Sequence, residues 1–428
     1  MQIGIVGAGV LGRLLAWQLA RSGHAVTVFD PATDAQQPAT GTLEARSPYA
    51  AGFTAAGMLS PIAELDNAGP AMAQLGWRSL ALWRAVADQL REQGCDTPLF
   101  AQHGSLLLAH GADRGAAQRV LARLDAATAQ ATGLPLPQAL DRQALARLEP
   151  AVAPGLQAWL LPDEGQVMPR ELLQALAAYA PGVRWCWGKR AERVETGLVV
   201  LADGEALRFD WAVDVRGVGF QPCGSAIQQG PVQDRRALPF AIEEQLLHSA
   251  NGMRGVRGVR GEVIWLHAPG VQLQRPLRLL HPRHRVYIVP RPGDLFVVGA
   301  SEIESEDRSP VSLRTAVELM AAAQSAVPEL AEARIVHMET NLRPALPDNE
   351  PRIECVEGLL RINGLFRHGW LIAPALVQDA LATWEPISVP LCGLSRGMPQ
   401  DKRGPWQEDA VAFSAAGLAT THASIQPC

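Results

Sequence analysis

The chain has 428 residues, of which 48% are hydrophobic and 19% are charged, and its formal net charge is −5 at pH 7. A chain of this length is too long for a single simple hydrophobic core, which favours two domains, and the composition excludes a disordered or fibrous protein. The mild negative charge argues against binding to nucleic acid or to an anionic membrane surface.

The sequence gives no indication of export, membrane insertion or a metal site. The N-terminus lacks the regions of a signal peptide, and no stretch approaches the roughly 20 apolar residues that span a bilayer. The six cysteines are scattered, without C-x-x-C or zinc spacing. The histidine-containing segment 281–285 lacks acidic ligands, and the basic tract 254–260 lacks interleaved aromatic residues. We therefore expect a cytoplasmic protein with reduced thiols, no metal, no membrane span and no nucleic-acid partner.

The first 30 residues have the pattern of a β-α-β unit. Residues 3–6 form a short apolar run, four leucines at helical spacing predict a helix over 11–20, and 25–29 predicts a second buried strand that ends at Asp30. Such a unit implies a parallel sheet with helices on its faces.

The remaining elements alternate between helical and strand periodicity. Helices are predicted at 75–90, 116–132, 141–148, 170–179, 313–323 and 372–383. Strands are predicted at 105–109, 183–187, 198–201, 206–209, 263–267, 286–289 and 295–298, with hairpin turns at 203–204 and 291–294. After Trp384 the periodicity fades, and we expect a weakly structured tail over 386–428.

A glycine-rich turn joins the first strand to the first helix. Gly7, Gly9 and Gly12 form G-x-G-x-x-G around Val10 and Leu11, and Asp30 ends the second strand. The glycines allow close approach to a pyrophosphate at the helix N-terminus, and Asp30 would accept hydrogen bonds from ribose hydroxyls. This context predicts a dinucleotide site, although the pattern alone leaves FAD and NAD open, and a glycine-rich turn of another β-α-β protein is the alternative.

Further segments resemble glycine oxidases of the thiamine-biosynthesis type, within the D-amino-acid oxidase family of FAD-dependent oxidoreductases. They are Ala55-Ala-Gly-Met-Leu59, Gly261-Glu262, Tyr287-Ile-Val-Pro-Arg291, Val298-Gly-Ala300, Asn341-Leu-Arg-Pro344, Phe366-Arg-His-Gly369 and Leu371-Ile-Ala-Pro374, in the family's order. The resemblance covers roughly residues 1 to 383.

The resemblance implies an α/β protein with a discontinuous Rossmann-type FAD-binding domain and an α+β substrate domain with a mostly antiparallel sheet. The implied FAD-binding domain comprises 1–90, 145–222 and 326–385, and the substrate-binding domain 91–144 and 223–325. The implied FAD contacts, beyond the glycine-rich turn and Asp30, are Ala56, Gly57, Met58, Val194, Gly217, Arg343, His368, Gly369 and Leu371. FAD would be held without a covalent link, because Asn341 stands where sarcosine oxidase relatives carry the cysteine that attaches flavin.

The same resemblance supplies candidate catalytic residues. Arg343 matches the arginine that holds the substrate carboxylate, Tyr287 a tyrosine that donates to it, and Arg367 a second pocket arginine. A guanidinium grips a carboxylate through two parallel N–H bonds, and a tyrosine hydroxyl adds a donor without a competing charge. The alternative for each arginine is a surface or structural ion pair.

Several positions depart from the glycine oxidase pattern. Arg285 stands where glycine oxidase carries histidine, Ser60 where it carries glycine, and Glu302 falls near a pocket methionine. The turn Asp214–Gly219 is an unusual version of the family's, and we expect Gly217 and Gly219 to approach the flavin. The preferred amino acid stays open.

The expected reaction is oxidative deamination of glycine or a small D-amino acid by hydride transfer to the flavin, with dioxygen as the final acceptor, in a homo-oligomer. One alternative is a dehydrogenase on the same fold that passes electrons to a quinone or another carrier. Another is a non-catalytic flavin-binding subunit of an amine-oxidising complex.

Overall fold

The computed structural model describes residues 1–35, 49–66, 68–130, 133–220, 253, 255–280 and 285–384. All of them belong to one compact unit, Met1–Cys392. The expected tail at 386–428 and residues 281–284 lie outside the described residues.

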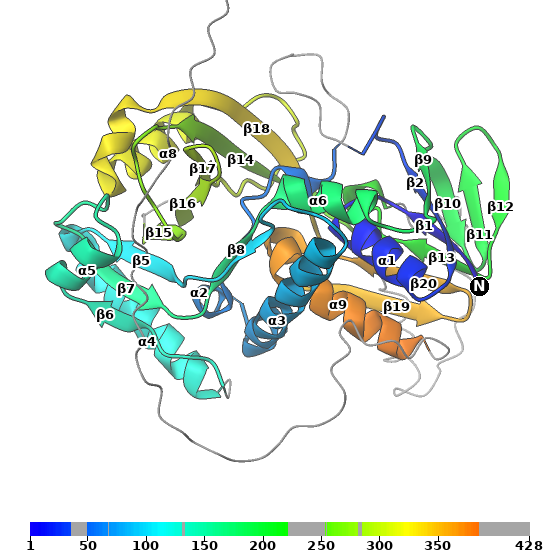
Figure 1. Cartoon of the computed structure of the whole chain (residues 1–428), viewed down its shortest axis with the longest axis horizontal. Coiled ribbons are helices and arrows are strands. Elements are labelled where there is room, and N and C mark those ends of the chain that lie inside the picture. The colour runs from blue at the N-terminus through cyan, green and yellow to red at the C-terminus, as the bar shows by residue number, and fades with distance from the viewer. Residues whose placement is uncertain are drawn as a thin grey trace, which may run out of the picture. The chain divides into compact units, whose positions relative to one another are not determined.

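A mostly parallel sheet forms the first half of the architecture (Figure 1). Its strands, in spatial order, are β19 (Arg352–Val356), β20 (Leu359–Asn363), β13 (Trp211–Asp214), β1 (Gln2–Val6), β2 (Ala25–Asp30) and β9 (Arg184–Trp187). All neighbours pair in parallel except β19 and β20, so the predicted β-α-β start and parallel sheet are confirmed.

The two faces of this sheet bury different layers. Ile3, Ile5 and Val28 pack against helices, whereas Val6 and Phe29 pack against a small antiparallel sheet. The helices are α1 (Val10–Arg21), α3 (Pro70–Glu92), α6 (Pro169–Ala178) and α9 (Gly369–Thr383). The small sheet contains β10 (Ala191–Glu195), β11 (Leu198–Leu201) and β12 (Ala206–Arg208), which includes the predicted hairpin at 203–204.

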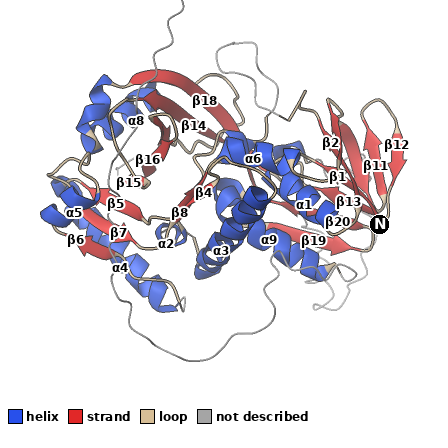
Figure 2. Cartoon of the chain, viewed as in Figure 1, coloured by secondary structure: helices blue, strands red, loops and turns tan. Residues whose placement is uncertain are grey.

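An eight-stranded mixed sheet forms the second half (Figure 2). Its spatial order is β18 (Arg334–Ala345), β14 (Arg257–His267), β17 (Leu295–Gly299), β16 (Arg285–Arg291), β15 (Leu277–Leu280), β5 (Ser105–Ala109), β7 (Gln157–Leu161) and β6 (Gln138–Leu140). Only β15 and β5 pair in parallel, and the predicted hairpin at 291–294 joins β16 and β17. One face packs on α5 (Arg142–Leu148) and α8 (Leu313–Ala326).

Short elements connect the two halves. The strands β3 (Met58–Leu59), β8 (Gly165–Val167) and β4 (Phe100–Ala101) form a small sheet, and α2 (Pro61–Glu64) follows β3 directly. The helix α4 (Arg114–Gln130) packs near α2 and α3.

The mixed α/β fold with a parallel and a mostly antiparallel sheet is confirmed. β7 lies within the range expected for the FAD-binding domain but pairs in the eight-stranded sheet, as does β18. The expected domain bounds therefore stay a prediction.

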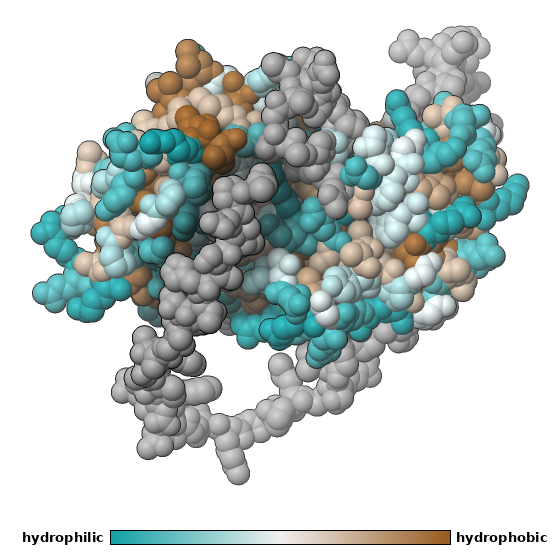
Figure 3. All heavy atoms as spheres, turned by 45° about the horizontal axis from the view of Figure 1, so that its top comes forward, coloured by the Kyte–Doolittle hydropathy of each residue, from teal (hydrophilic) through white to brown (hydrophobic). Residues whose placement is uncertain are grey.

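Exposed apolar side chains gather on α8 and β18. Leu313, Val317, Ile335, Val336 and Met338 are all exposed, and Figure 3 shows hydrophobic side chains over this part of the molecule. Among the described helices, none combines the length and apolar character needed to cross a bilayer.

Candidate active site

A cavity of about 1070 Å³ lies between the parallel sheet and the eight-stranded sheet. Its lining runs from the glycine-rich turn after β1 to the ends of β14, β16 and β18. This volume suits an extended cofactor together with a small substrate.

The glycine-rich turn lines one end of the cavity through Gly7, Gly9, Val10 and Leu11. Gly7 has φ +106°, and a Cβ there would lie 2.7 Å from the Val215 carbonyl oxygen. Gly9 precedes α1 without capping it through a side chain, so the first N–H groups of the helix are available to an anion. The turn therefore fits a pyrophosphate.

Gly12 has a different role from the other glycines of the turn. It is absent from the cavity lining, and a Cβ at this position would overlap the Gly7 carbonyl oxygen. Gly12 therefore lets α1 pack closely under the turn.

Asp30 stands at the cavity wall where the ribose was expected. Its Oδ2 accepts from the Ala8 N–H at 2.6 Å and its Oδ1 from the Ala32 N–H at 2.9 Å. Burial raises the pKa of Asp30, although these two bonds and the charge of Arg13 oppose the shift.

Arg13 is a buried residue that the sequence analysis missed. Its Nε donates to the Ala8 carbonyl at 2.8 Å, Nη1 to that of Leu173 at 2.8 Å and Nη2 to that of Ala35 at 3.0 Å. Its guanidinium also lies over the Phe53 ring, 5.1 Å from the centroid. Burial lowers the pKa of Arg13 to about 10, so the residue stays charged at neutral pH. It joins the helix α1 to the backbone of the glycine-rich turn.

The central part of the cavity is lined by most of the remaining residues expected to contact FAD. They are Ala56, Gly57, Met58, Gly217, Gly219, His368, Gly369 and Leu371. Val194 is the exception, because its side chain lies in the core beside Val199, and its neighbours Arg190 and Ala191 line the cavity instead. Asn341 lines the cavity as an amide that donates to Thr54 Oγ1 at 3.1 Å, so this position offers no thiol for flavin attachment.

Tyr287 and Arg343 lie together at the other end of the cavity. Arg343 Nη1 donates to the Ser301 carbonyl at 3.0 Å and to the Arg260 carbonyl at 3.3 Å. Burial lowers the pKa of Arg343 and raises that of Tyr287. A guanidinium stays protonated in proteins, and a raised pKa keeps the proton on the tyrosine hydroxyl, so Arg343 is a cation and Tyr287 a neutral donor. Within the described part of the chain, Arg343 makes no ion pair at 4.0 Å or less.

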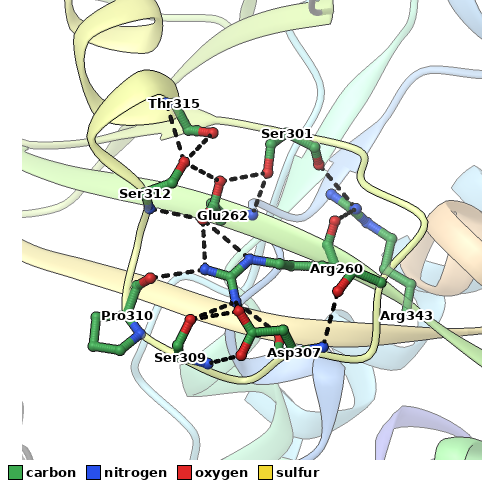
Figure 4. A network of polar contacts seen from close by, with 10 residues as sticks. Arg260, Glu262, Ser301, Asp307, Ser309, Pro310, Ser312, Thr315 and Arg343 are labelled. Atoms are coloured by element: carbon green, nitrogen blue, oxygen red, sulfur yellow. Dashed lines mark hydrogen bonds and ion pairs between the residues drawn. The ribbon is translucent and has the colours of Figure 1, made fainter.

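A polar network fixes the backbone that holds Arg343 (Figure 4). Glu262 is fully buried and accepts from Arg260 at 2.6 Å, from Ser301 Oγ at 3.0 Å and from the Ser312 N–H at 2.9 Å. The network joins β14 to the segment between β17 and α8, and so places the Ser301 carbonyl.

Arg367 also lines the cavity, but it is part of a buried charge cluster. Glu64 Oε2 accepts from Arg367 Nη2 at 2.6 Å and lies 3.4 Å from His368 Nδ1, and Glu64 Oε1 accepts from Arg278 Nη2 at 3.0 Å. Although burial opposes it, the charges of Arg278, of His368 where it is protonated, and of Arg367 lower the pKa of Glu64 to about 2. Burial lowers the pKa of His368 to about 4, so its imidazole is neutral at pH 7. Arg367 thus forms a structural ion pair, which the sequence analysis gave as the alternative to a role in binding the substrate.

Two of the positions that depart from the glycine oxidase pattern, Glu302 and Ser60, line the cavity. Glu302 lines it with a half-exposed side chain, and its Oε2 lies 3.6 Å from Arg367 Nη1. Ser60 lines it as a buried residue, whereas the side chain of Arg285 lies outside the described residues. Across the described ranges, no group of three His, Cys, Asp or Glu side chains is placed to hold a metal ion.

The comparisons with known proteins agree with this geometry. The model of the DAO family, described as FAD dependent oxidoreductase, matches residues 2–380. The chain is 35% identical over 380 residues to the putative thiamine biosynthesis oxidoreductase ThiO of Rhizobium etli, which covers 89% of this chain and 95% of that relative. It is 25% identical over 389 residues to a glycine oxidase of Geobacillus kaustophilus, covering 87% of this chain and 89% of the relative.

Two solved structures share the fold. The iminodiacetate oxidase (IdaA) of Chelativorans sp. BNC1 superposes with a TM-score of 0.68 at 24% identity, covering 91% of this chain and 97% of that one. A glycine oxidase of Bacillus cereus gives a TM-score of 0.69 at 22% identity, covering 89% and 93%. The expected resemblance to glycine oxidases and the expected cofactor are confirmed, and the chain belongs to the DAO family of FAD-dependent oxidoreductases.

Proposed function

We propose that this protein is an oxidase of glycine or of a small D-amino acid. The overall reaction consumes the amino acid, water and dioxygen, and yields a 2-oxo acid, ammonia and hydrogen peroxide. The relatives named glycine oxidase and ThiO support this assignment. The observation that carries it is the positive charge of Arg343, which has no close acidic partner among the described residues.

Arg343 is a half-buried cation that lacks a close acidic partner among the described residues. Two backbone carbonyls orient its guanidinium without compensating its charge. A charge that is partly withdrawn from water and left uncompensated is costly, and a carboxylate that accepts charge-assisted hydrogen bonds offsets that cost. The site is therefore suited to a ligand with a carboxylate.

Tyr287 would add a second donor to the same carboxylate. Burial raises the pKa of its hydroxyl, so the proton is present at neutral pH. Two donors from different strands fix the carboxylate, and with it the direction in which the α-carbon points.

The residues at the glycine-rich end of the cavity and at its centre would hold FAD. Gly7, Gly9 and the N-terminus of α1 suit its pyrophosphate, Asp30 its ribose, and the segment Ala56–Met58 with Gly217 its ring system. When bound, FAD supplies the acceptor for the hydride that leaves the α-carbon. The protein's own contribution is to bind the amino acid with its amine neutral, to orient it and to exclude water.

An anaerobic titration of the FAD-loaded protein tests the proposal. Glycine, sarcosine, D-alanine and D-proline are added in turn while flavin absorbance is followed, and air is then admitted. We expect bleaching by at least one compound, with recovery and peroxide formation in air. Bleaching without recovery would instead indicate a dehydrogenase that uses another acceptor. A flavin that no compound reduces would contradict the assignment and favour a non-catalytic flavin-binding subunit.

A matched variant separates substrate binding from cofactor binding. Arg343→Ala should retain FAD but require much higher substrate concentrations for bleaching, because the carboxylate loses its cation. Unchanged titration curves would remove Arg343 from the site. The expected homo-oligomer stays a prediction, which the mass of the purified protein in solution tests.

A further inference from the structure

Five charged side chains converge on the Arg343 end of the cavity. The cations are Arg278, Arg343 and Arg367, and the anions are Glu64 and Glu302. They come from distant parts of the sequence, so their balance of charge is a property of the fold.

The carboxylate of Glu64 already has hydrogen-bond donors within this group. Each of its carboxylate oxygens accepts from a different arginine, and its side chain is only 11% exposed. Glu64 with Arg278 and Arg367 therefore forms a cluster with one net positive charge, in which Arg278 Nη1 has no hydrogen-bond partner among the described residues. His368 adds no charge at neutral pH, because burial lowers its pKa to about 4.

Glu302 is the acidic group of this end that remains open to the cavity. Its side chain is 50% exposed, and its contact with Arg367 is long, at 3.6 Å. Burial raises the pKa of Glu302 most, the charge of Arg343 lowers it, and the charges of Glu64 and Glu304 raise it. Arg308 also lines the cavity, but it is exposed and its electrostatic partner is Glu306.

With Glu302 ionised, the five side chains carry a net charge of +1, since three cations face two anions. One substrate carboxylate neutralises this charge when the substrate amine is neutral. A second carboxylate would leave the site with a net negative charge, and it would face the Glu302 carboxylate in a partly desolvated space, where like charges repel strongly.

We propose that Glu302 restricts the substrate to amino acids with a single carboxylate. This inference rests on the proposed amino-acid oxidation and adds a specificity-determining residue to it. It distinguishes the chain from an oxidase of dicarboxylic amines such as iminodiacetate, although a solved structure of that activity shares its fold.

The test compares pairs of substrates that differ by one carboxylate. Sarcosine and iminodiacetate form one pair, and D-alanine and D-aspartate the other. For the FAD-loaded enzyme, we expect kcat/KM to be at least about tenfold higher for the monocarboxylate of whichever pair is oxidised. Glu302→Gln should raise the relative kcat/KM of the dicarboxylate roughly tenfold, because it removes the opposing charge while keeping the side-chain size.

Glu304→Gln is the matched control. Glu304 lies two residues further along the same segment, is 65% exposed and pairs with Arg257 outside the cavity. Its charge acts on Glu302 only from outside the cavity, so its substitution should change the ratio far less than Glu302→Gln does. Efficient oxidation of the dicarboxylates by the unaltered enzyme, or equal ratios in Glu302→Gln and the unaltered enzyme, would overturn the inference and leave amino-acid oxidation standing.

A binding measurement keeps the inference testable when turnover is absent. Acetate and malonate, which also differ by one carboxylate, are titrated into the FAD-loaded protein while the flavin spectrum is followed. Weaker binding of malonate, relieved in Glu302→Gln, supports the role of Glu302. Malonate binding as tight as that of acetate in the unaltered protein contradicts it. Failure of the proposed function appears separately, as a flavin that none of the amino acids reduces.

Discussion

The guanidinium of Arg343 occupies the space that a side chain at Gly261 would fill. A Cβ built on Gly261 would lie 2.5 Å from Arg343 Cζ and 2.6 Å from both of its terminal nitrogens. Gly299 has the same relation to Tyr287, whose hydroxyl oxygen lies 2.6 Å from a Cβ at Gly299. Arg343 thus lies over Gly261 of β14, and Tyr287 lies over Gly299 of the neighbouring strand β17. The two glycines leave room for these candidate carboxylate-binding side chains.

Gly261→Ala should therefore displace the Arg343 guanidinium without removing it. Losing one charge-assisted hydrogen bond costs about 1.5–3 kcal/mol, so we expect kcat/KM for the amino acid to fall roughly 10- to 100-fold. FAD should remain bound, because Gly261 lies away from the glycine-rich turn. Steady-state kinetics and the flavin content of the purified variant measure both effects.

Gly155→Ala is a suitable control for this substitution. A Cβ at Gly155 would meet no atom within 4 Å, and its backbone does not require glycine. Its kinetics should match those of the unaltered protein. Unchanged kinetics in Gly261→Ala would show that Arg343 does not contact the substrate from its present position.

Arg343→Lys separates charge from geometry at the same site. Lysine keeps the positive charge but has no planar fork, and it cannot hold the two carbonyls and a carboxylate together in the same way. We expect KM to rise about tenfold or more while FAD binding is unchanged. A lysine variant with the KM of the unaltered protein would mean that the site needs only a positive charge.

The end of the cavity proposed to bind FAD was largely predictable from the sequence, because the residues that form it are close together in the chain. Gly7 and Gly9 lie between a strand and a helix that their own neighbours specify, and Asp30 follows at the end of the next strand. The periodicity of a short segment is sufficient to place such residues.

The charge cluster was not predictable, because its members meet only in the folded chain. Arg278 lies 214 residues after Glu64, and Arg367 a further 89. β18 escaped prediction for a related reason. It is an edge strand with exposed Ile335, Val336 and Met338, so its sequence lacks the alternation of a half-buried strand.

Glu164 is a buried carboxyl that braces the segment carrying Glu64. Its Oε1 accepts from the backbone N–H groups of Ile62 and Ala63 at 2.9 and 3.0 Å, and its Oε2 accepts from Ser105 Oγ at 2.5 Å. Burial raises the pKa of Glu164 from 4.5 to about 7. Between these values the folded protein keeps a proton that the unfolded chain has lost.

The free energy of unfolding should therefore fall as pH rises from 4.5 to about 7, by up to about 1.4 kcal/mol per pH unit from this group. Glu164→Gln should remove this part of the slope, so the variant gains stability relative to the unaltered protein as pH rises. Denaturant unfolding at several pH values measures it. Glu329→Gln, at an exposed position, is the control, and a slope that Glu164→Gln leaves intact would exclude Glu164 as its source.

Arg13→Ala should weaken both the fold and FAD binding, because Arg13 links α1 to the Ala8 carbonyl of the glycine-rich turn. The substitution leaves the carbonyls of Ala8, Leu173 and Ala35 without this donor, and it removes the guanidinium from over Phe53. With a buried charged donor lost, we expect the free energy of unfolding to fall by about 2–5 kcal/mol.

The Kd for FAD, measured by flavin fluorescence below the melting temperature of the variant, should rise. Arg21→Ala, at an exposed position of the same helix, should change neither quantity appreciably. A variant that loses stability but binds FAD with the original Kd would show that Arg13 supports the core without shaping the turn.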